Sequence, residues 1–193
     1  VQLSGGHFLT SATIGDLPMQ TGLLSRAIQK MSETGVDIVK VGLFAEHLAR
    51  EILSVFKRQA DRGIDIVLVC FADREFLNLD FNALREAGLL GVMLDTADKS
   101  RGSLRKRVTQ QDLEQLIHRA RRAELMVGLA GSLRREDIPS LRDLEPDYLG
   151  FRGALCRDNI RERAVDFRAV KQIRSMITTE LAGTAEISVK SGG

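Results

Sequence analysis

Short apolar runs typical of buried strands alternate with amphipathic stretches typical of helices along most of this chain of 193 residues. The strand-like runs cover 8–14, 36–43, 65–72, 91–94, 125–130 and 148–151. In one intervening stretch, apolar residues recur at the spacing of a single helix face, at Leu113, Leu116, Ile117 and Ala120. This alternation predicts a parallel sheet whose strands are connected by helical crossovers.

The ends of the predicted helices have recognisable capping residues. Gly35, Gly63 and Gly88 each fall just past a helical pattern, where a left-handed residue commonly ends a helix. Thr109 and Asp112 form a pair of the kind that caps the first turn of a helix. These residues place helix boundaries between the strand-like runs.

Polar residues directly follow five of the six strand-like runs. They are Gly15-Asp16, Asp73-Arg74, 95–99, Gly131-Ser132 and Arg152-Gly153. In a (β/α)8 barrel every carboxyl-terminal strand end faces one shared site, so this distribution favours a barrel over an open sheet with one crevice. No glycine-rich dinucleotide-binding motif or P-loop is present. We therefore predict a TIM (β/α)8 barrel of the α/β class.

The number of strands sets a limit on this barrel. TIM barrels typically need about 250 residues, and six strands leave open sheet edges that must be covered. We therefore expect one or two N-terminal βα units to be absent from this chain. Residues 1–177 are predicted to form a single incomplete barrel domain, and 178–193, which are small and polar, a mobile tail.

Lys40 lies in the middle of the strand-like run 36–43. A buried ammonium group must find a partner, face a polar cavity or lose its proton. Because a neutral lysine amine attacks carbonyl carbon, Lys40 indicates Schiff-base or anion-binding chemistry. A structural ion pair is the alternative.

Carboxylates at strand ends are the next candidates for chemistry. Asp95 could shuttle protons while the nearby ammonium of Lys99 activates a carbonyl or binds phosphate. A surface ion pair in a loop is the alternative for both residues. Asp16 and Asp73 occupy comparable strand ends, and either could instead cap the following helix. These four residues and Lys40 are the predicted catalytic residues.

Glycines follow the last two strand-like runs, in Gly131-Ser132 and Arg152-Gly153-Ala154. Glycine lets backbone N–H groups approach an anion closely, and a helix that begins there adds a favourable dipole. The loops after strands 7 and 8 form the usual phosphate site of TIM barrels, and an arginine can bind phosphate bidentately. These five residues are the predicted phosphate site, and two ordinary glycine turns are the alternative.

The charged and apolar stretches indicate neither a nucleic acid nor a membrane as a partner. The formal net charge is +2, and acidic residues surround the basic stretches 101–107 and 118–122. With few aromatic residues available for stacking, these stretches are more typical of solvated surface than of nucleic-acid sites. The longest apolar run, 66–72, is too short to cross a bilayer. We expect neither nucleic acid nor a membrane as a partner.

Cysteine and histidine are scarce. Cys70 and Cys156 lie in or beside apolar runs, which favours reduced core residues of a cytoplasmic protein over a disulfide framework. His7, His47 and His118 lack the spacing of metal ligands. We predict neither a metal site nor a cofactor.

Five ordered motifs give the chain a specific family resemblance. They lie at 11–18, 39–43, 93–99, 129–132 and 152–156. In these motifs the chain resembles the (5-formylfuran-3-yl)methyl phosphate synthase family of methanofuran biosynthesis, over about residues 11–177.

The resemblance implies a TIM-barrel lyase that joins two molecules of glyceraldehyde 3-phosphate, with loss of phosphate and water and without a metal or organic cofactor. Lys40, Asp95 and Lys99 match active-site positions of the family. Asp95 is implied as the general acid and base, and both lysines as sources of charge or amine chemistry. Arg152 and the adjoining glycine loops are implied to hold phosphate. Asp16 and Asp73, after the first and third strand-like runs, are implied as further active-site residues.

One motif of the family is not found in this chain. The family has an Asp-x-Lys motif on its first strand, and no such segment precedes Ser11. Without it, Lys40 or Lys99 would have to form the imine. Another lysine-dependent sugar-phosphate aldolase, or a non-catalytic barrel that binds phosphorylated metabolites, is the alternative function. The expected partner is a small phosphorylated triose, and a homo-oligomer is compatible with the sequence.

Overall fold

A computed structural model describes residues 8–45, 48–74, 76–97 and 102–178 of the chain. Its single sheet has six strands in the order β1-β2-β3-β4-β5-β6, and every neighbouring pair is parallel. The strands are β1 (Ser11–Thr13), β2 (Ile38–Gly42), β3 (Asp65–Phe71), β4 (Gly91–Asp95), β5 (Met126–Leu129) and β6 (Tyr148–Leu149). The predicted βα alternation is confirmed, and each strand lies within or next to its predicted run.

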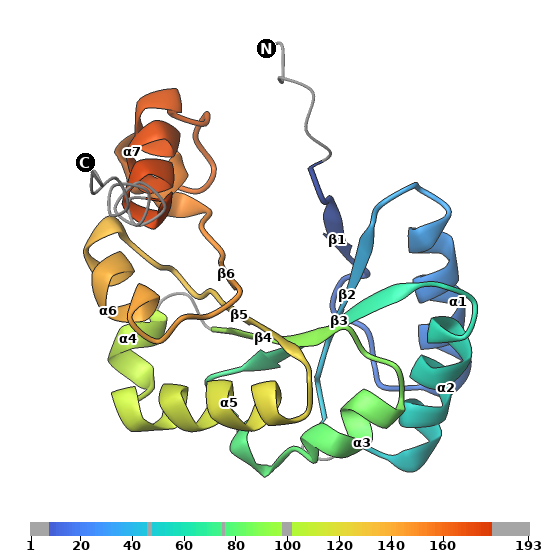
Figure 1. Ribbon diagram of the computed structural model, residues 1–193. Helices are drawn as coiled ribbons and strands as arrows, with labels where there is room; N and C mark the ends of the chain where they lie inside the picture. The colour runs from blue at the N-terminus through green and yellow to red at the C-terminus, as the bar shows by residue number, and fades with distance from the viewer. Residues whose placement is uncertain (1–7, 46–47, 75, 98–101, 179–193) are drawn as a thin grey trace, which may run out of the picture.

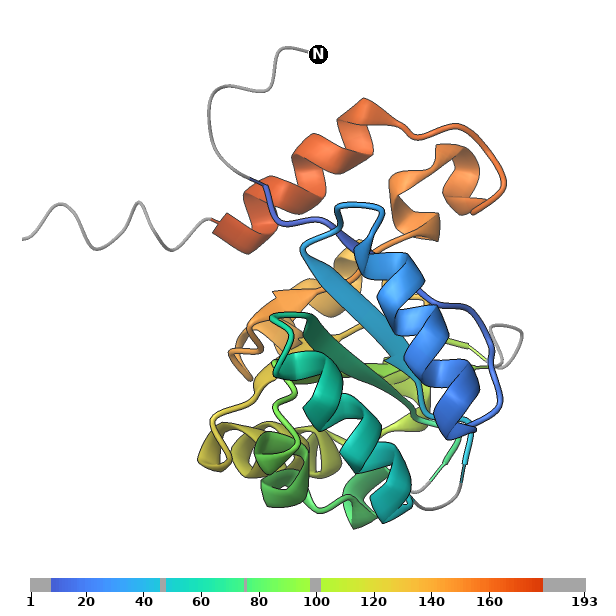
Figure 2. The same ribbon diagram turned by 90° about the vertical axis from the view of Figure 1, so that its right-hand side faces the viewer.

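The sheet is curled into a half-barrel with helices on its outside (Figure 1). The helices are α1 (Thr21–Ser32), α2 (Arg50–Ala60), α3 (Phe81–Glu86), α4 (Leu104–Arg107), α5 (Gln110–Arg122), α6 (Ile138–Arg142) and α7 (Phe167–Thr178). Short 3-10 turns add η1 (Phe76–Asn78), η3 (Arg135–Asp137), η4 (Gly153–Leu155) and η5 (Arg157–Asn159). Helices α1 and α2 lie side by side against one half of the sheet, and α7 lies apart from them (Figure 2).

Both faces of the sheet carry apolar side chains, because a parallel strand is covered on both sides. Val39 and Val41 of β2 are fully or almost fully buried in the main core, together with Leu24 and Ile28 of α1 and Val55 of α2. A second, smaller cluster combines residues at alternate positions of the strands, namely Val67, Val69, Met93 and Ala130, with Tyr148 packed against them. The first cluster attaches the helices to the sheet, and the second fills its concave face.

Local caps follow the sequence pattern. Gly35, Gly63 and Gly88 have φ values of +83°, +82° and +76°, so the predicted left-handed helix ends are confirmed. The Thr109 hydroxyl accepts a hydrogen bond from the backbone N–H of Asp112, which confirms the predicted cap of α5. The apolar face of α5 is buried, as its periodicity predicted.

Some expectations were wrong in detail. The first strand is only Ser11–Thr13, shorter than the predicted 8–14, and Phe8 and Leu9 are 54% and 68% exposed. The N-cap of α1 is Gln20, so Asp16 does not cap it. Helix α7 extends to Thr178, which places the first residue of the expected tail in the helix, and 179–193 lie outside the described residues.

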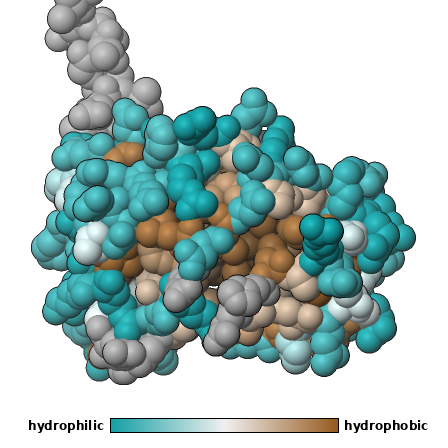
Figure 3. All heavy atoms as spheres, turned by 90° about the horizontal axis from the view of Figure 1, so that it is seen from below, coloured by the Kyte–Doolittle hydropathy of each residue, from teal (hydrophilic) through white to brown (hydrophobic). Residues whose placement is uncertain are grey.

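Six parallel strands with alternating helices form a barrel-like half. The absence of one or two N-terminal βα units from this chain stays a prediction. Figure 3 shows the molecule from below relative to Figure 1. On the face seen there, apolar side chains gather in the middle, within a rim of hydrophilic ones. None of the helices in the described segments is both long and apolar enough to cross a bilayer.

Candidate functional site

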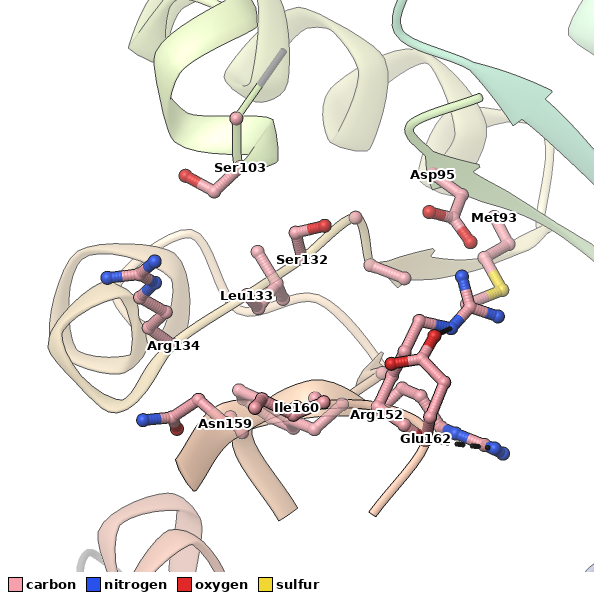
Figure 4. A pocket seen from close by; sticks show the side chains of 18 of the residues that line it. Met93, Asp95, Ser103, Ser132, Leu133, Arg134, Arg152, Asn159, Ile160 and Glu162 are labelled. Carbon is pink, nitrogen blue, oxygen red and sulfur yellow. Dashed lines mark hydrogen bonds and ion pairs between the residues drawn. The ribbon is translucent and has the colours of Figure 1, made fainter. Parts of the chain in front are cut away.

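A cavity of about 560 Å³ lies beyond the carboxyl ends of β4, β5 and β6, and Lys40 from β2 reaches its wall. Besides Lys40, it is lined by Met93 and Asp95 and by the four segments 102–103, 130–134, 150–154 and 159–162. The carboxyl ends of parallel strands are where barrel proteins place their sites. Figure 4 shows the labelled side chains arranged around this space.

Lys40 faces the cavity because of the alternation along β2. Its neighbours Val39 and Val41 are 1% and 0% exposed in the main core, so the Lys40 side chain extends from the opposite face of the strand. Lys40 is half-buried and lines the cavity. The sequence left three possibilities for Lys40: a charged partner, a polar cavity or loss of its proton. In the structure its side chain faces a cavity with polar residues in its lining.

Asp95 is the last residue of β4 and lines the same cavity. Its carboxylate accepts a hydrogen bond of 2.6 Å from the backbone N–H of Thr96, whose side chain is fully buried. This hydrogen bond fixes one carboxylate oxygen at the strand end. Asp95 and Lys40, which are far apart in sequence, are therefore brought to one site.

Gly131 and Ser132 form the turn after β5. Gly131 has a φ of +107°, and a Cβ at this position would lie 2.8 Å from Cγ2 of Thr96. Glycine is therefore required both by the backbone conformation and by the close approach to the residue after Asp95. The Gly131 carbonyl accepts a hydrogen bond of 2.8 Å from the N–H of Leu104, which begins α4. Ser132, at φ +51°, is exposed toward the cavity.

The segment after β6 closes another side of the cavity. Arg152, Gly153 and Ala154 all line it, and Arg152 donates a hydrogen bond of 3.4 Å to the carbonyl oxygen of Arg161. A Cβ at Gly150 would lie 3.0 Å from both Ala130 Cβ and Met93 Cε, so the floor of the cavity is tightly packed. All five predicted phosphate-binding residues therefore line one cavity with Lys40 and Asp95.

Three predicted catalytic residues are not part of this lining. Asp16 is exposed in the segment after β1. The Asp73 carboxylate pairs with the guanidinium of Arg107 and accepts a hydrogen bond of 2.8 Å from the N–H of Ala97. Asp73 thus ties the loop after β3 to the loop after β4 and to α4. Lys99 lies outside the described residues.

The pairing of Asp73 also corrects the interpretation of the basic stretch 101–107. This stretch was expected to be solvated surface, but the Arg107 side chain is only 10% exposed and that of Asp73 only 16%. Arg107 is the last residue of α4, and its guanidinium pairs with Asp73 instead of facing solvent. In this stretch, the sequence pattern did not distinguish a buried cation from an exposed one.

Several lining residues were missed from the sequence. Ser103 and Arg134 follow the ends of β4 and β5, and Asn159, Arg161 and Glu162 come from the loop between β6 and α7. The two ends of that loop are joined by an isolated antiparallel β-bridge, a backbone pairing between Cys156 and Val165. Arg134 follows Ser132 by two residues, and its position beside a predicted phosphate loop was the one signal that could have found it.

The charges around the cavity are unequal. Four of the lining residues are cationic and two are anionic: Lys40, Arg134, Arg152 and Arg161 against Asp95 and Glu162. Arg161 and Glu162 pair with each other, with 3.6 Å between Nε and Oε1. The excess of cations suits an anionic ligand. Among the described residues, no three or more histidine, cysteine or acidic side chains lie close enough together to hold a metal ion.

The fold and this site together define a barrel-type α/β protein with a cavity at its carboxyl-terminal strand ends, lined by more cationic than anionic side chains. Solved structures with the same fold include the BexX/CysO complex of Amycolatopsis orientalis, with a TM-score of 0.62 and 12% identity over 95% of this chain and 71% of the other. A 3-hexulose-6-phosphate synthase has a TM-score of 0.56 and 15% identity over 80% of this chain and 68% of the other.

Sequence comparison gives the family. A family model described as 4-HFC-P synthase matches residues 1–174. The (5-formylfuran-3-yl)methyl phosphate synthase of Methanopyrus kandleri is 32% identical over 89% of this chain and 74% of its own length. A protein of Methylorubrum extorquens, described as a candidate for the same activity, is 37% identical over 87% of this chain and 69% of its own length. The chain belongs to the 4-HFC-P synthase family, which confirms the resemblance seen in its motifs.

Proposed function

We propose that this protein condenses two molecules of glyceraldehyde 3-phosphate into (5-formylfuran-3-yl)methyl phosphate, for the synthesis of a methanofuran-type C1 cofactor. The reaction balances when one phosphate and two molecules of water leave. The observation that carries the proposal is the convergence of Lys40, Asp95 and the glycine and arginine loops on one cavity. Membership of the 4-HFC-P synthase family supports the same product.

Lys40 is proposed to supply the amine. Its neutral Nζ adds to an aldehyde carbon of the substrate, and water leaves as the imine forms. The protonated imine withdraws electrons from the neighbouring carbon and makes its C–H bond acidic. The backbone of Lys40 is held in the sheet on both sides, which fixes the point from which its side chain extends into the cavity.

Asp95 is proposed to move the proton. A carboxylate at the end of β4 could take the proton from the carbon next to the imine, and phosphate would then leave from the following carbon with its bonding electrons. The Thr96 N–H holds one carboxylate oxygen in place for this transfer. Lys99 belongs to the same motif and is proposed to add positive charge.

The loops after β5 and β6 are proposed to hold substrate phosphate. Gly131 and Gly153 keep side chains away from the backbone there, and Ser132 and Arg152 offer a hydroxyl and a guanidinium from opposite loops. A guanidinium can bind two phosphate oxygens at once. This arrangement orients the carbonyl end of a triose toward Lys40 and Asp95.

The proposal is tested by incubating the protein with glyceraldehyde 3-phosphate and following furan absorbance and free phosphate together. Equal molar amounts of furan and phosphate are expected. Borohydride reduction during turnover, followed by peptide mass mapping, should attach the substrate carbon chain to the peptide that contains Lys40. A labelled peptide without furan would favour another lysine-dependent aldolase, and binding without turnover would favour a non-catalytic barrel.

A further inference from the structure

The cavity has a second cationic side that the proposed phosphate site does not use. Ser103 and Arg134 lie on the side of the cavity away from Asp95 and Met93, and Asn159 lies below Arg134 in the same view (Figure 4). Arg152 and Glu162 lie on the side of Asp95 (Figure 4). The cationic groups of the cavity are therefore divided between two ends.

The Arg134 guanidinium is available for a ligand. Within the described ranges, no carboxylate forms an ion pair with it, whereas Arg107 and Arg163 pair with Asp73 and Asp158. The nearby carboxylate of Asp137 is used differently, because it accepts a hydrogen bond of 2.8 Å from the backbone N–H of Arg134. A guanidinium that lines a cavity without an acidic partner can form charge-assisted hydrogen bonds with an anionic ligand.

Two neutral donors accompany this guanidinium. Ser103 stands at the N-cap position of α4, yet its side chain makes no capping hydrogen bond. Asn159 has a φ of +57° and follows Asp158, which also has a φ of +57°. Two successive residues in the left-handed region are uncommon outside glycine, so the loop is held in a costly conformation that places 159–162 on the cavity.

We propose that Ser103, Arg134 and Asn159 form a second binding subsite for a phosphate monoester, opposite the subsite of Ser132 and Arg152. This inference rests on the proposed function, because a condensation of two triose phosphates brings two phosphate groups into one cavity. The cavity volume of about 560 Å³ falls within the range of small-molecule sites. Each arginine then anchors one phosphate, and the two carbon chains meet between them, near Lys40 and Asp95.

The inference is tested by titration calorimetry of the full chain with glycerol 3-phosphate. This probe has the phosphate of a triose but no carbonyl group, so it cannot form an imine or turn over. We expect two molecules to bind per chain in the wild type, one in Arg134→Gln, one in Arg152→Gln, and none in the double variant. Loss of a charged hydrogen bond should weaken binding at the affected subsite by about 10- to 100-fold. Arg134→Lys should weaken it less, because it keeps the charge and loses the bidentate geometry.

Arg168→Gln is the matched control, because Arg168 is exposed on α7 and does not line the cavity. It removes the same charge and should leave both binding events unchanged. Circular dichroism should show that all variants are folded. Binding of a single molecule to the wild type, binding of two to Arg134→Gln, or no binding at all would overturn the second subsite.

Failure of the second subsite and failure of the proposed function give different results. If furan does not form but two molecules bind and Arg134→Gln removes one, the proposed function fails and the second subsite stands. If furan forms while the wild type binds one molecule, the function stands and the second subsite fails.

Discussion

Lys40 and Asp95 lie on the same face of the sheet although β3 separates their strands. Lys40 is level with Val67 of β3, and Asp95 is level with Phe71 of the same strand, so Asp95 lies four residues further toward the carboxyl ends. Because successive side chains alternate between the two faces, an even offset puts both on one face. The amine therefore comes from a deeper level of the sheet than the carboxylate, and both line one cavity.

Replacement of Lys40 tests its role as the amine. Lys40→Ala should lower kcat for furan formation by at least about 100-fold, since nucleophilic and acid-base groups contribute factors of this size or more. The variant should also lose borohydride labelling. Lys171→Ala, which removes an exposed lysine of α7 away from the cavity, is the control and should behave as wild type. Wild-type turnover in Lys40→Ala would remove Lys40 from the mechanism.

Asp95→Asn separates the carboxylate's chemistry from its structural hydrogen bond. The amide oxygen can still accept from the N–H of Thr96, so the strand end should keep its shape, while the group can no longer take a proton. We expect turnover to fall by about 100- to 10,000-fold with an unchanged unfolding midpoint. Steady-state kinetics and urea unfolding measure the two effects. Loss of stability with normal turnover in the folded fraction would indicate a purely structural residue.

The ion pair of Asp73 with Arg107 should contribute to stability. Both side chains are largely buried, and Asp73→Ala would leave the Arg107 guanidinium without its carboxylate. Breaking one partner of a buried pair costs about 3–5 kcal/mol of unfolding free energy. Lys57→Ala breaks an exposed pair with Asp61, whose side chains are 52% and 57% exposed, and should cost less than about 1 kcal/mol. Equal losses in urea unfolding would contradict the structural role assigned to Asp73.

Alanine substitutions at Gly131 and Gly35 separate the cost of a left-handed backbone from the cost of a steric clash. Gly131→Ala introduces a Cβ at φ +107° and 2.8 Å from Thr96, whereas Gly35→Ala introduces one at φ +83° with nothing within 4 Å. The second change carries only the cost of the backbone conformation, about 1–2 kcal/mol. The first adds a steric clash, so we expect a loss of about 3 kcal/mol or more. If thermal unfolding showed the same loss in both variants, the close packing of the β5 loop on Thr96 would be in error.

Strands β2 to β5 could be predicted because each contains a short aliphatic run that is buried on both faces of the sheet. The β2 run is an example, since the pattern at 36–43 contains the observed strand Ile38–Gly42 and places Lys40 inside it. The first run was predicted too long because β1 is an edge strand that, within the described part of the chain, pairs with β2 alone. Apolar residues such as Phe8 and Leu9 give the same pattern whether or not a partner covers them.

The site was predictable where residues directly follow strands, as at Asp95, Gly131 and Arg152. It was not predictable where placement depends on loop conformation or on a distant partner. Asn159 reaches the cavity through two left-handed residues, and no periodicity records such a turn. Asp73 looks like any other strand-end carboxylate until the fold brings Arg107 to it.

Burial of Cys70 predicts a loss of stability in alkaline solution. Desolvation raises the pKa of its thiol from 9.0 to about 12, so the folded protein keeps the proton after the unfolded chain has lost it. The stability that this provides is fully present below pH 9 and is lost as the pH rises toward 12, because ionisation then favours the unfolded chain. Burial and the neighbouring Asp147 raise the pKa of Tyr148 from 10.0 to about 12, which adds a smaller loss that begins one pH unit higher.

Cys70→Ala isolates the contribution of the thiol. The variant should be less stable than wild type at pH 8 because of the small cavity that it creates. Between pH 8 and 10.5, however, its unfolding free energy should fall by about 2 kcal/mol less than that of wild type, since one group with a raised pKa has been removed. Tyr148 is present in both proteins, so its effect cancels in the comparison. Parallel declines in urea unfolding across this range would show that the Cys70 thiol ionises as readily in the folded protein as in the unfolded chain.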